Sequence, residues 1–488
     1  MSSFDEIRNN RIQKLDALKK AGMQAYPVVS RRDYSLVEVV DQFAKLSKAG
    51  KPLFLCGRVM SLRPQGALTF FTFDDGTAKF QGLIKKEEVS DAQFALFAEA
   101  VDIGDFIQVR GTLFETKRGE KTLQVSEWTM LSKGLRPLPE KWHGLQDADE
   151  RFRRRYLDTL MSPEVKQRFL LRSAIISSIR TFLEKAQYLE VETPMLQPLS
   201  GGASAEPFMT HHNALDMDLY LRIAPELYLK KLLIGGFPKV YELNRNFRNE
   251  GIDMTHNPEF TMLEFYEAYS TKEEQMVFVE KMLKALVKKV HGTTTFEYDG
   301  NTIDVSKKFA VISFPNLLKQ YALLSNPESI SLEEVTLRAM QLGVKVDPTD
   351  PVQKIIDNIY KKTCRPKLIQ PTFVVDYPTE NFPLAKKTPS NPALAEVFQL
   401  VVGGIETVKA FSELNDPLDQ RERFAAQDEN KKKGDAEAQS TDEEFIEAME
   451  YGMPPAGGVG IGIDRLVMLL TNTRNIKEVI LFPTMRPR

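Results

Sequence analysis

Two arginines in unusual surroundings are the first candidates for chemistry. Arg248 lies in the polar segment RNFRNE at 245–250, between two apolar strands. The planar fork of donors on an arginine at such a junction can hold a phosphate and a carboxylate together. Arg465 follows the glycine-rich segment GGVGIGID at 457–464 and opens an apolar helix, from which it can reach a phosphate or stack on a base. A salt-bridged surface turn and an ordinary glycine-rich turn are the plain alternatives.

Two predicted strands each place an acid on a face that also carries aromatic side chains. These faces are Phe260, Met262, Glu264 and Tyr266 in the strand at 260–266, and Lys409, Phe411 and Glu413 in the strand at 405–414. Since a buried carboxylate needs a partner, one cationic ligand would satisfy both acids if the strands share a sheet. The alternative is a pair of edge-strand acids that face water.

The composition excludes several kinds of site. Only two cysteines occur, Cys56 and Cys364, without the spacing of a zinc site or a disulfide framework. The net charge of −2 gives no global positive field, so any contact with RNA must use local patches. No phosphate loop of the Walker or dinucleotide type is present, so an ATP site must be built by another route. With no apolar run of about 18 residues and a polar amino terminus, the sequence predicts a cytoplasmic protein.

A β-rich segment near the amino terminus predicts the first domain. A helix at 8–22 precedes strands at 53–60, 68–73, 78–84, 105–114 and 122–128. The dipeptide Asp75-Gly76 predicts a hairpin between two of them. Five short strands over about 80 residues favour a small β-barrel of the oligonucleotide-binding (OB) type, in a domain at 1–135.

The region 136–160 is rich in proline and charge and is interpreted as a linker. It contains the basic cluster Arg151, Arg153, Arg154 and Arg155. A solvated linker and an RNA-facing patch are equally open interpretations of this cluster.

The pattern changes to mixed helices and strands in the remaining residues, 161–488. Ser162 and Pro163 form a good N-cap and first-turn pair for a long helix. Strands are predicted at 219–223, 239–243, 260–266, 372–376, 396–402 and 405–414, the last two joined at Gly403-Gly404. Many strands with short turns favour an α+β domain, an antiparallel sheet flanked by helices, with a helical insertion at about 270–370.

Three segments, in this order, resemble the signature motifs of class II aminoacyl-tRNA synthetases. They are the helix and strand ending in YLEVETP (188–194), FRNE (247–250) with HNPEF (256–260), and GVGIGIDR (458–465). The match covers nearly the whole chain and is closest to the bacterial lysine branch, in the subgroup shared with the aspartate and asparagine enzymes. The resemblance implies a class II catalytic domain that activates L-lysine with ATP and Mg²⁺. It also implies transfer of lysine to the 3′ end of tRNA(Lys) by a homodimer.

The resemblance assigns roles around ATP. The residues implied are Arg248, Glu250, His256, Asn257, Phe260, Glu406 and Arg465. Arg248 and Arg465 are the catalytic candidates. Arg248 would bridge the lysine carboxylate and the α-phosphate as pyrophosphate leaves, while Arg465 and Phe260 would sandwich the adenine ring. Glu250 would contact the adenine amino group, and His256 would approach the γ-phosphate.

The resemblance also implies a lysine pocket. Its residues are Gly202, Glu226, Arg248, Glu264, Tyr266, Lys409, Phe411 and Glu413. Gly202 and Glu226 match positions that hold the α-amino group, and Glu264, Tyr266 and Glu413 match the pocket for the side-chain ammonium. Buried acids would reject neutral isosteres strongly, because their charges would be left unpaired.

The barrel resembles the anticodon-binding domain of this subgroup. Alternation places Phe70 opposite Phe71 and Phe73, which are predicted to be core. Phe70 would then stack on an anticodon base, with Arg63 and Gln81 nearby. Core packing of Phe70 is the alternative.

Three features depart from the family pattern. Gln399 stands where the family has a glutamate that binds magnesium, so metal binding through Glu406 and Gln399 is expected to be weaker. Lys409 replaces an asparagine near the substrate carboxylate, and it is expected either to bind that carboxylate or to pair with Glu413 and compete with the substrate. In a regular strand Glu406 faces away from Lys409, and a bulge near Thr407-Val408 would bring both to one face.

Three functional hypotheses follow. The leading one is an active lysine–tRNA ligase. The second is a lysine-activating paralogue with a different acceptor, against which the barrel argues. The third is a catalytically silent RNA-binding homologue, against which Arg248, Glu250 and Arg465 argue.

Overall fold

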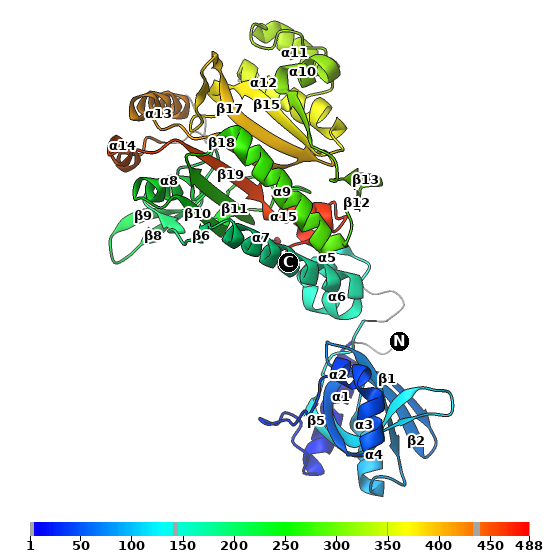
Figure 1. Ribbon diagram of the computed structural model, residues 1–488. Helices are drawn as coiled ribbons and strands as arrows, with labels where there is room; N and C mark the ends of the chain where they lie inside the picture. Colours follow the sequence, from blue (N-terminus) through cyan, green and yellow to red (C-terminus); the bar gives the residue numbers. More distant parts are fainter. Residues whose placement is uncertain (1–3, 140–144, 349, 433–439, 488) are drawn as a thin grey trace. The chain divides into compact units, whose positions relative to one another are not determined.

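The computed structural model describes residues 4–139, 145–348, 350–432 and 440–487. The chain divides into two compact units, Met1–Gly144 and Leu145–Arg488, each of which is described by itself (Figure 1). Residues 140–144 of the expected linker lie outside the described part. No helix among the described residues is long and apolar enough to cross a membrane.

The first unit is a closed barrel with helices packed around it (Figure 1). Its strands are β1 (Leu53–Gln65), β2 (Leu68–Asp74), β3 (Lys79–Lys85), β4 (Phe106–Glu115) and β5 (Lys121–Ser132), paired in the order β1-β2-β3-β5-β4. Its helices are α1 (Phe4–Lys20), α2 (Leu36–Asp41), α3 (Phe43–Ala49) and α4 (Asp91–Ala100). Each predicted strand is present, and the OB-type barrel is confirmed.

The barrel core follows the alternation of β2. Phe71 and Phe73 are fully buried, as predicted. The ring of Phe71 lies directly against Gly82 of β3, in the space that a Cβ atom would occupy. Any larger residue at position 82 would therefore displace a core ring.

The second unit is built on one large sheet (Figure 1). Its strands are β6 (Leu189–Glu190), β10 (Lys239–Phe247), β11 (Glu259–Ala268), β14 (Ala310–Ser313), β15 (Thr372–Pro378), β16 (Lys387–Thr388), β17 (Asn391–Val402), β18 (Ile405–Ser412) and β19 (Ala456–Gly462). The order is β14-β15-β17-β18-β19-β11-β10-β6, with β16 beside β17. The pairs β6·β10 and β14·β15 are parallel, and the other neighbours are antiparallel, which confirms the predicted α+β architecture.

Three helices cover one face of this sheet. They are α7 (Pro163–Lys185), α9 (Lys272–His291) and α15 (Ile463–Leu470). Figure 1 shows α9 running across the sheet. Buried side chains such as Ile179, Val279 and Val467 pack there with Val459 and Ile461 of β19. On the opposite face these helices leave β11, β18 and β19 uncovered, and a site can form there.

Smaller elements surround the sheet. They are α5 (Ala148–Arg153), α6 (Arg155–Met161), α8 (Glu226–Ile234), α10 (Phe314–Leu317), α11 (Leu332–Gln341), α12 (Val352–Ile359), α13 (Pro417–Lys432), α14 (Glu443–Glu450), the hairpin β12 (Thr295–Tyr298) and β13 (Asn301–Asp304), and a sheet of β7 (Leu196–Gln197), β9 (Met217–Leu221) and β8 (Met209–His212). The helices α10, α11 and α12 contribute to a second apolar core on the β15 and β17 side of the sheet.

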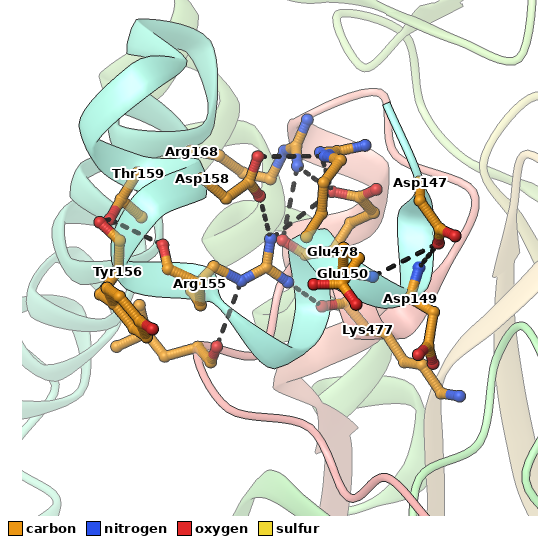
Figure 2. A network of polar contacts seen from close by, with 12 residues as sticks. Asp147, Asp149, Glu150, Arg155, Tyr156, Asp158, Thr159, Arg168, Lys477 and Glu478 are labelled. Carbon is orange, nitrogen blue, oxygen red and sulfur yellow. Dashed lines mark hydrogen bonds and ion pairs between the residues drawn. The ribbon is translucent and has the colours of Figure 1, made fainter. Parts of the chain in front are cut away.

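The basic cluster of the expected linker is mainly structural. Arg155 has an exposed fraction of 1% and donates to Oδ2 of Asp158 at 2.7 Å and to the carbonyl oxygen of Lys477 at 2.6 Å (Figure 2). Arg168 of α7 reaches Glu478 at 2.7 Å in the same network. For Arg155, therefore, both the solvated linker and the RNA-facing patch are wrong. The network holds the carboxyl-terminal segment against α5, α6 and α7.

Candidate functional site

A cavity of about 280 Å³ opens on the sheet face opposite the covering helices. Most residues predicted for ATP, lysine and metal line it: Gly202, Glu226, Arg248, Glu250, His256, Asn257, Phe260, Glu264, Tyr266, Glu406, Lys409, Phe411 and Arg465. Glu413 and Gln399 are not among its lining residues. The fold therefore brings together, in one site, residues that lie more than 200 positions apart in the sequence.

The floor of the cavity is the glycine-rich strand β19, which lies between β11 and β18. Gly460 pairs with Glu264 on one side and with Lys409 on the other, and Gly458 pairs with Tyr266 and Phe411 in the same way. Because glycines have no side chains, the acid and aromatic residues of β11 and β18 stand as walls above a bare backbone. The prediction that both strands share a sheet is confirmed.

Arg248 follows the end of β10, and its buried guanidinium Nε atom has no hydrogen-bond partner among the residues that the structure describes. Its backbone N–H donates to the carbonyl oxygen of Pro258 at 2.9 Å, which fixes its position. The guanidinium carbon lies 5.1 Å from the centre of the Phe260 ring. A buried donor without a partner favours binding of an anion.

Arg465 lies in the first turn of α15, on the neighbouring side of the cavity. Its Nη1 atom donates to the carbonyl oxygen of Glu406 at 3.2 Å, and its Nη2 atom lies 2.9 Å from Nε2 of His256. The ring of His256 also bonds to Asp253 through Nδ1 at 2.9 Å. In this structure the guanidinium that lies over the Phe260 ring belongs to Arg248.

The position of Arg465 depends on Asp464, which sequence reasoning did not single out. Asp464 accepts from Nη1 of Arg172 at 2.6 Å and from the backbone N–H of Thr261 at 2.7 Å. Arg172 belongs to α7, so this carboxylate joins the long helix, β11 and the start of α15. The acidic residue directly before Arg465 was the available signal, but its partner lies 292 residues away.

Glu264 is a buried acid with an altered protonation equilibrium. Its exposed fraction is 5%, and its Oε2 atom accepts from the hydroxyl of Tyr266 at 3.2 Å. Burial raises the pKa of Glu264 to about 8, and the charge of Glu226 adds to the rise. A cation entering the cavity would shift this group toward its carboxylate form.

Glu413 already has a cationic partner. The ammonium of Lys230, on α8, forms ion pairs with Glu413 and with Oε1 of Glu226 at 2.7 Å. Burial disfavours the charged form of Lys230, but the two carboxylates outweigh it and raise its pKa. The expectation that Lys409 pairs with Glu413 is therefore wrong. Glu413 is already paired with Lys230 before any ligand binds. The i, i+4 spacing of Glu226 and Lys230 was the sequence signal for this pair.

A bulge brings Glu406 and Lys409 to the cavity face. The pairing of β17 with β18 shifts between Leu400 and Val401, so that Thr407 is the extra residue. This confirms the bulge predicted near Thr407-Val408. Both Glu406 and Lys409 line the cavity.

Of the two expected magnesium ligands, Glu406 lines the cavity and Gln399 does not. Gln399 has an exposed fraction of 9%, and its Oε1 atom accepts from the hydroxyl of Tyr377 at 2.7 Å. Lys409 lies directly opposite Gln399 in the strand pairing. Among the described residues no group of three or more His, Cys, Asp and Glu side chains is gathered for a metal ion. Glu406 alone offers magnesium fewer protein oxygens than two carboxylates would, so the phosphates of a substrate would have to supply most of the remaining ligands.

The three anticodon candidates lie on the outer surface of the barrel. Arg63 pairs with Phe70 across β1 and β2, and its Nη2 atom donates to Oε1 of Gln81 at 3.0 Å. Phe70 is half-buried and outside the core cluster, so the core alternative is wrong. A partly exposed ring beside a guanidinium and an amide is a platform on which a base can stack.

Each of the two units matches a known protein family. Residues 147–486 match the family of class II tRNA synthetases (D, K and N), and residues 54–131 match the OB-fold nucleic acid binding domain. The lysine–tRNA ligase of Pelotomaculum thermopropionicum is 49% identical over 487 residues, which cover 99% of this chain and 96% of the relative. Those of Carboxydothermus hydrogenoformans and Moorella thermoacetica are 47% and 46% identical, covering 99% and 100% of this chain and 99% of each relative.

Proposed function

This chain belongs to the class II tRNA synthetases for aspartate, lysine and asparagine and is a lysine–tRNA ligase, and we propose that the cavity on its sheet is where lysine and ATP react. The observation that carries the proposal is the glycine floor, which leaves room for two substrates between acidic and cationic walls. The acids suit the two amino groups of lysine, and the unpartnered cations suit its carboxylate and the phosphates.

In the first step the lysine carboxylate attacks the α-phosphorus of ATP. A bond from a carboxylate oxygen to phosphorus forms as the bond to pyrophosphate breaks, which gives lysyl-adenylate. The terminal ribose hydroxyl of tRNA then attacks the lysyl carbonyl, and AMP leaves. Arg248 stabilises the negative charge of the first step, and its unpartnered Nε atom supports this role. No side-chain nucleophile is needed, because positioning carries much of the rate.

Lysine is bound by both walls of the cavity. Gly202 and Glu226 hold the α-amino group, and Glu264 and Tyr266 hold the side-chain ammonium, with Phe411 as an apolar wall. Glu413 acts beside them through its pair with Lys230. The buried acid Glu264, close to Tyr266, supports this arrangement.

ATP lies on the side of Phe260 and Arg465. Phe260 and Arg465 bind the adenine ring, Glu250 its amino group, and His256 the γ-phosphate, while Asn257 lines the same side. Magnesium would neutralise part of the phosphate charge, and Glu406 would help to hold it. The exposed anion-binding donors of Arg465 and His256 support this orientation.

The barrel binds tRNA(Lys) at its anticodon. Phe70 stacks on a base, and Arg63 and Gln81 bind base edges. The exposure of these side chains and the match to a nucleic acid binding domain support this role.

The active form is a cytoplasmic homodimer, with the helix α7 and the strand β6 at its interface. Exposed apolar side chains on α7 and on neighbouring segments support the interface: Leu170, Leu189, Met195, Leu196, Met209 and Leu215. A homodimer would bury this apolar surface.

The test is ATP–pyrophosphate exchange with lysine, arginine, aspartate and asparagine in turn. Exchange with lysine is expected, followed by aminoacylation of tRNA(Lys) in a second assay. Exchange with aspartate or asparagine in place of lysine would refute the specificity. Exchange without aminoacylation would indicate the paralogue with another acceptor, and no exchange would indicate the silent homologue.

A further inference from the structure

Four positions form one row across the sheet on the cavity side. They are Glu264 in β11, Gly460 in β19, Lys409 in β18 and Gln399 in β17, each paired with the next. Lys409 thus lies between the acid proposed to bind lysine and the glutamine that replaces a metal ligand.

The ammonium of Lys409 has no fixed anionic partner. It makes no hydrogen bond or ion pair with any other residue in the part of the chain described, and it lies 4.6 Å from the centre of the Phe382 ring. The cavity walls desolvate the ammonium and lower the pKa of Lys409, while the charge of Glu406 opposes this. An unpaired cation that lines a cavity favours an anionic ligand.

Lys409 lies between the lysine pocket and the residues proposed to bind ATP. The charges of Glu406 and Glu226 both favour the ammonium form of Lys409, and the carbonyl oxygen of Glu406 accepts from Arg465. Lys230, and not Lys409, forms the ion pair with Glu413 beside the lysine pocket. ATP is proposed to lie beside Arg465, so its phosphates would supply a large anion on this side of the cavity.

We propose that the ammonium of Lys409 stabilises the negative charge of the bound phosphates, as a metal ion held by the protein would. ATP then binds here with fewer divalent cations than at a site with acids at both 399 and 406. The inference rests on the proposed function, since it assumes that ATP occupies this cavity. Gln399 fits the same scheme, because its oxygen is committed to Tyr377 and a carboxylate at that position would pair with Lys409 and neutralise it. A lysine needs no ligand set of its own, unlike magnesium.

The test measures ATP binding and not turnover. ATP is titrated calorimetrically into the full chain with Mg²⁺ and with EDTA, for the parent, Lys409→Asn, Gln399→Glu and the double variant. The parent is expected to lose less than about tenfold in affinity without Mg²⁺, and the double variant more than about a hundredfold. Electron paramagnetic resonance with Mn²⁺ should count fewer ions per bound ATP in the parent than in the double variant. Lys387→Asn, which removes an exposed lysine paired with Asp419, is the matched control and should behave as the parent.

Equal loss of affinity in parent and double variant, or equal Mn²⁺ counts, would overturn the inference. It would also be overturned if Lys409→Asn weakened the binding of lysine alone, because the ammonium would then serve the substrate carboxylate. Thermal unfolding of each variant identifies any that do not fold, and Gln399→Glu alone should already raise the Mn²⁺ count. Lysine-dependent pyrophosphate exchange in the parent is measured in parallel. Its absence would count against the proposed function, but the ATP affinities would still test the role of Lys409.

Discussion

Lys230 and Glu413 form an ion pair beside the lysine pocket, and neither side chain is exposed to solvent. Lys230 also bonds to Glu226, so one internal ammonium holds two of the acids proposed for substrate binding. Glu264 forms no ion pair with the described residues and instead accepts from the hydroxyl of Tyr266. The pocket is thereby built to accept one more ammonium.

Replacing Lys230 with methionine is expected to destabilise the catalytic unit strongly. Removing one partner of a buried pair leaves uncompensated charge and typically costs about 3–5 kcal/mol. The midpoint of thermal unfolding measures this loss, and the double variant Lys230→Met/Glu413→Gln should recover part of it. Lys231→Met is the control, because its pair with Glu444 is long at 3.7 Å and Glu444 is exposed. A parent-like midpoint for Lys230→Met would show that the pair is not needed.

Lysine binding is expected to release a proton. Burial raises the pKa of Glu264 to about 8, so this group is mostly neutral at pH 7 in the empty pocket. The ammonium of lysine favours the carboxylate, so a proton leaves on binding, and affinity should increase as the pH rises from 6 to 8, by at most about tenfold per unit. Calorimetry in buffers of different ionisation enthalpy counts the proton. Glu264→Gln should bind lysine weakly and release none; proton release by that variant would assign the proton to another group.

Strand alternation was sufficient to predict much of the site. It placed Glu264 and Tyr266 on one face, and the parity of Glu406 against Lys409 required the bulge at Thr407. These are local rules, since successive side chains of a strand point to opposite faces. The same rule separated Phe70 from the core.

The partners of buried charges were not predictable from the sequence. Lys230 lies on a helix whose sequence neighbourhood does not reveal that Glu413 packs against it, and Arg172 meets Asp464 only through the tertiary fold. A cluster such as Arg151 to Arg155 has the same composition whether it binds RNA or closes an ion-pair network. Only burial distinguishes these cases, and burial depends on the whole fold.

Arg155 is expected to act on stability and not on tRNA affinity. Its guanidinium is buried among Asp158 and the carbonyl oxygens of the carboxyl-terminal segment (Figure 2). Arg155→Met should therefore lower stability by about 3–5 kcal/mol, as breaking a buried pair does. At a temperature where the variant is folded, its dissociation constant for tRNA should equal that of the parent. Arg154→Met removes a more exposed pair with Glu150, and the expected loss is below about 1 kcal/mol. A clear loss of tRNA affinity in folded Arg155→Met would restore the RNA-facing interpretation.

Gly458 is expected to control lysine binding through the floor of the pocket. A Cβ atom at this position would overlap the carboxylate of Glu413 and lie 2.5 Å from Cε1 of Tyr266. Gly458→Ala should therefore push both groups out of place, and the Michaelis constant for lysine in pyrophosphate exchange should rise by at least about tenfold, since a misplaced polar contact typically costs about 1–3 kcal/mol. The Michaelis constant for ATP should change much less.

Gly462→Ala is the comparison on the same strand. Its methyl group would meet only the side chain of Arg465, at an ordinary contact distance of 3.6 Å, so the effect on lysine should be small. If both variants raised the Michaelis constant for lysine equally, the loss would come from stiffening or distorting β19 as a whole. If Gly458→Ala left it unchanged, Glu413 and Tyr266 would have no part in holding the substrate. The contrast between these two glycines therefore tests whether the bare backbone of β19 shapes the pocket position by position.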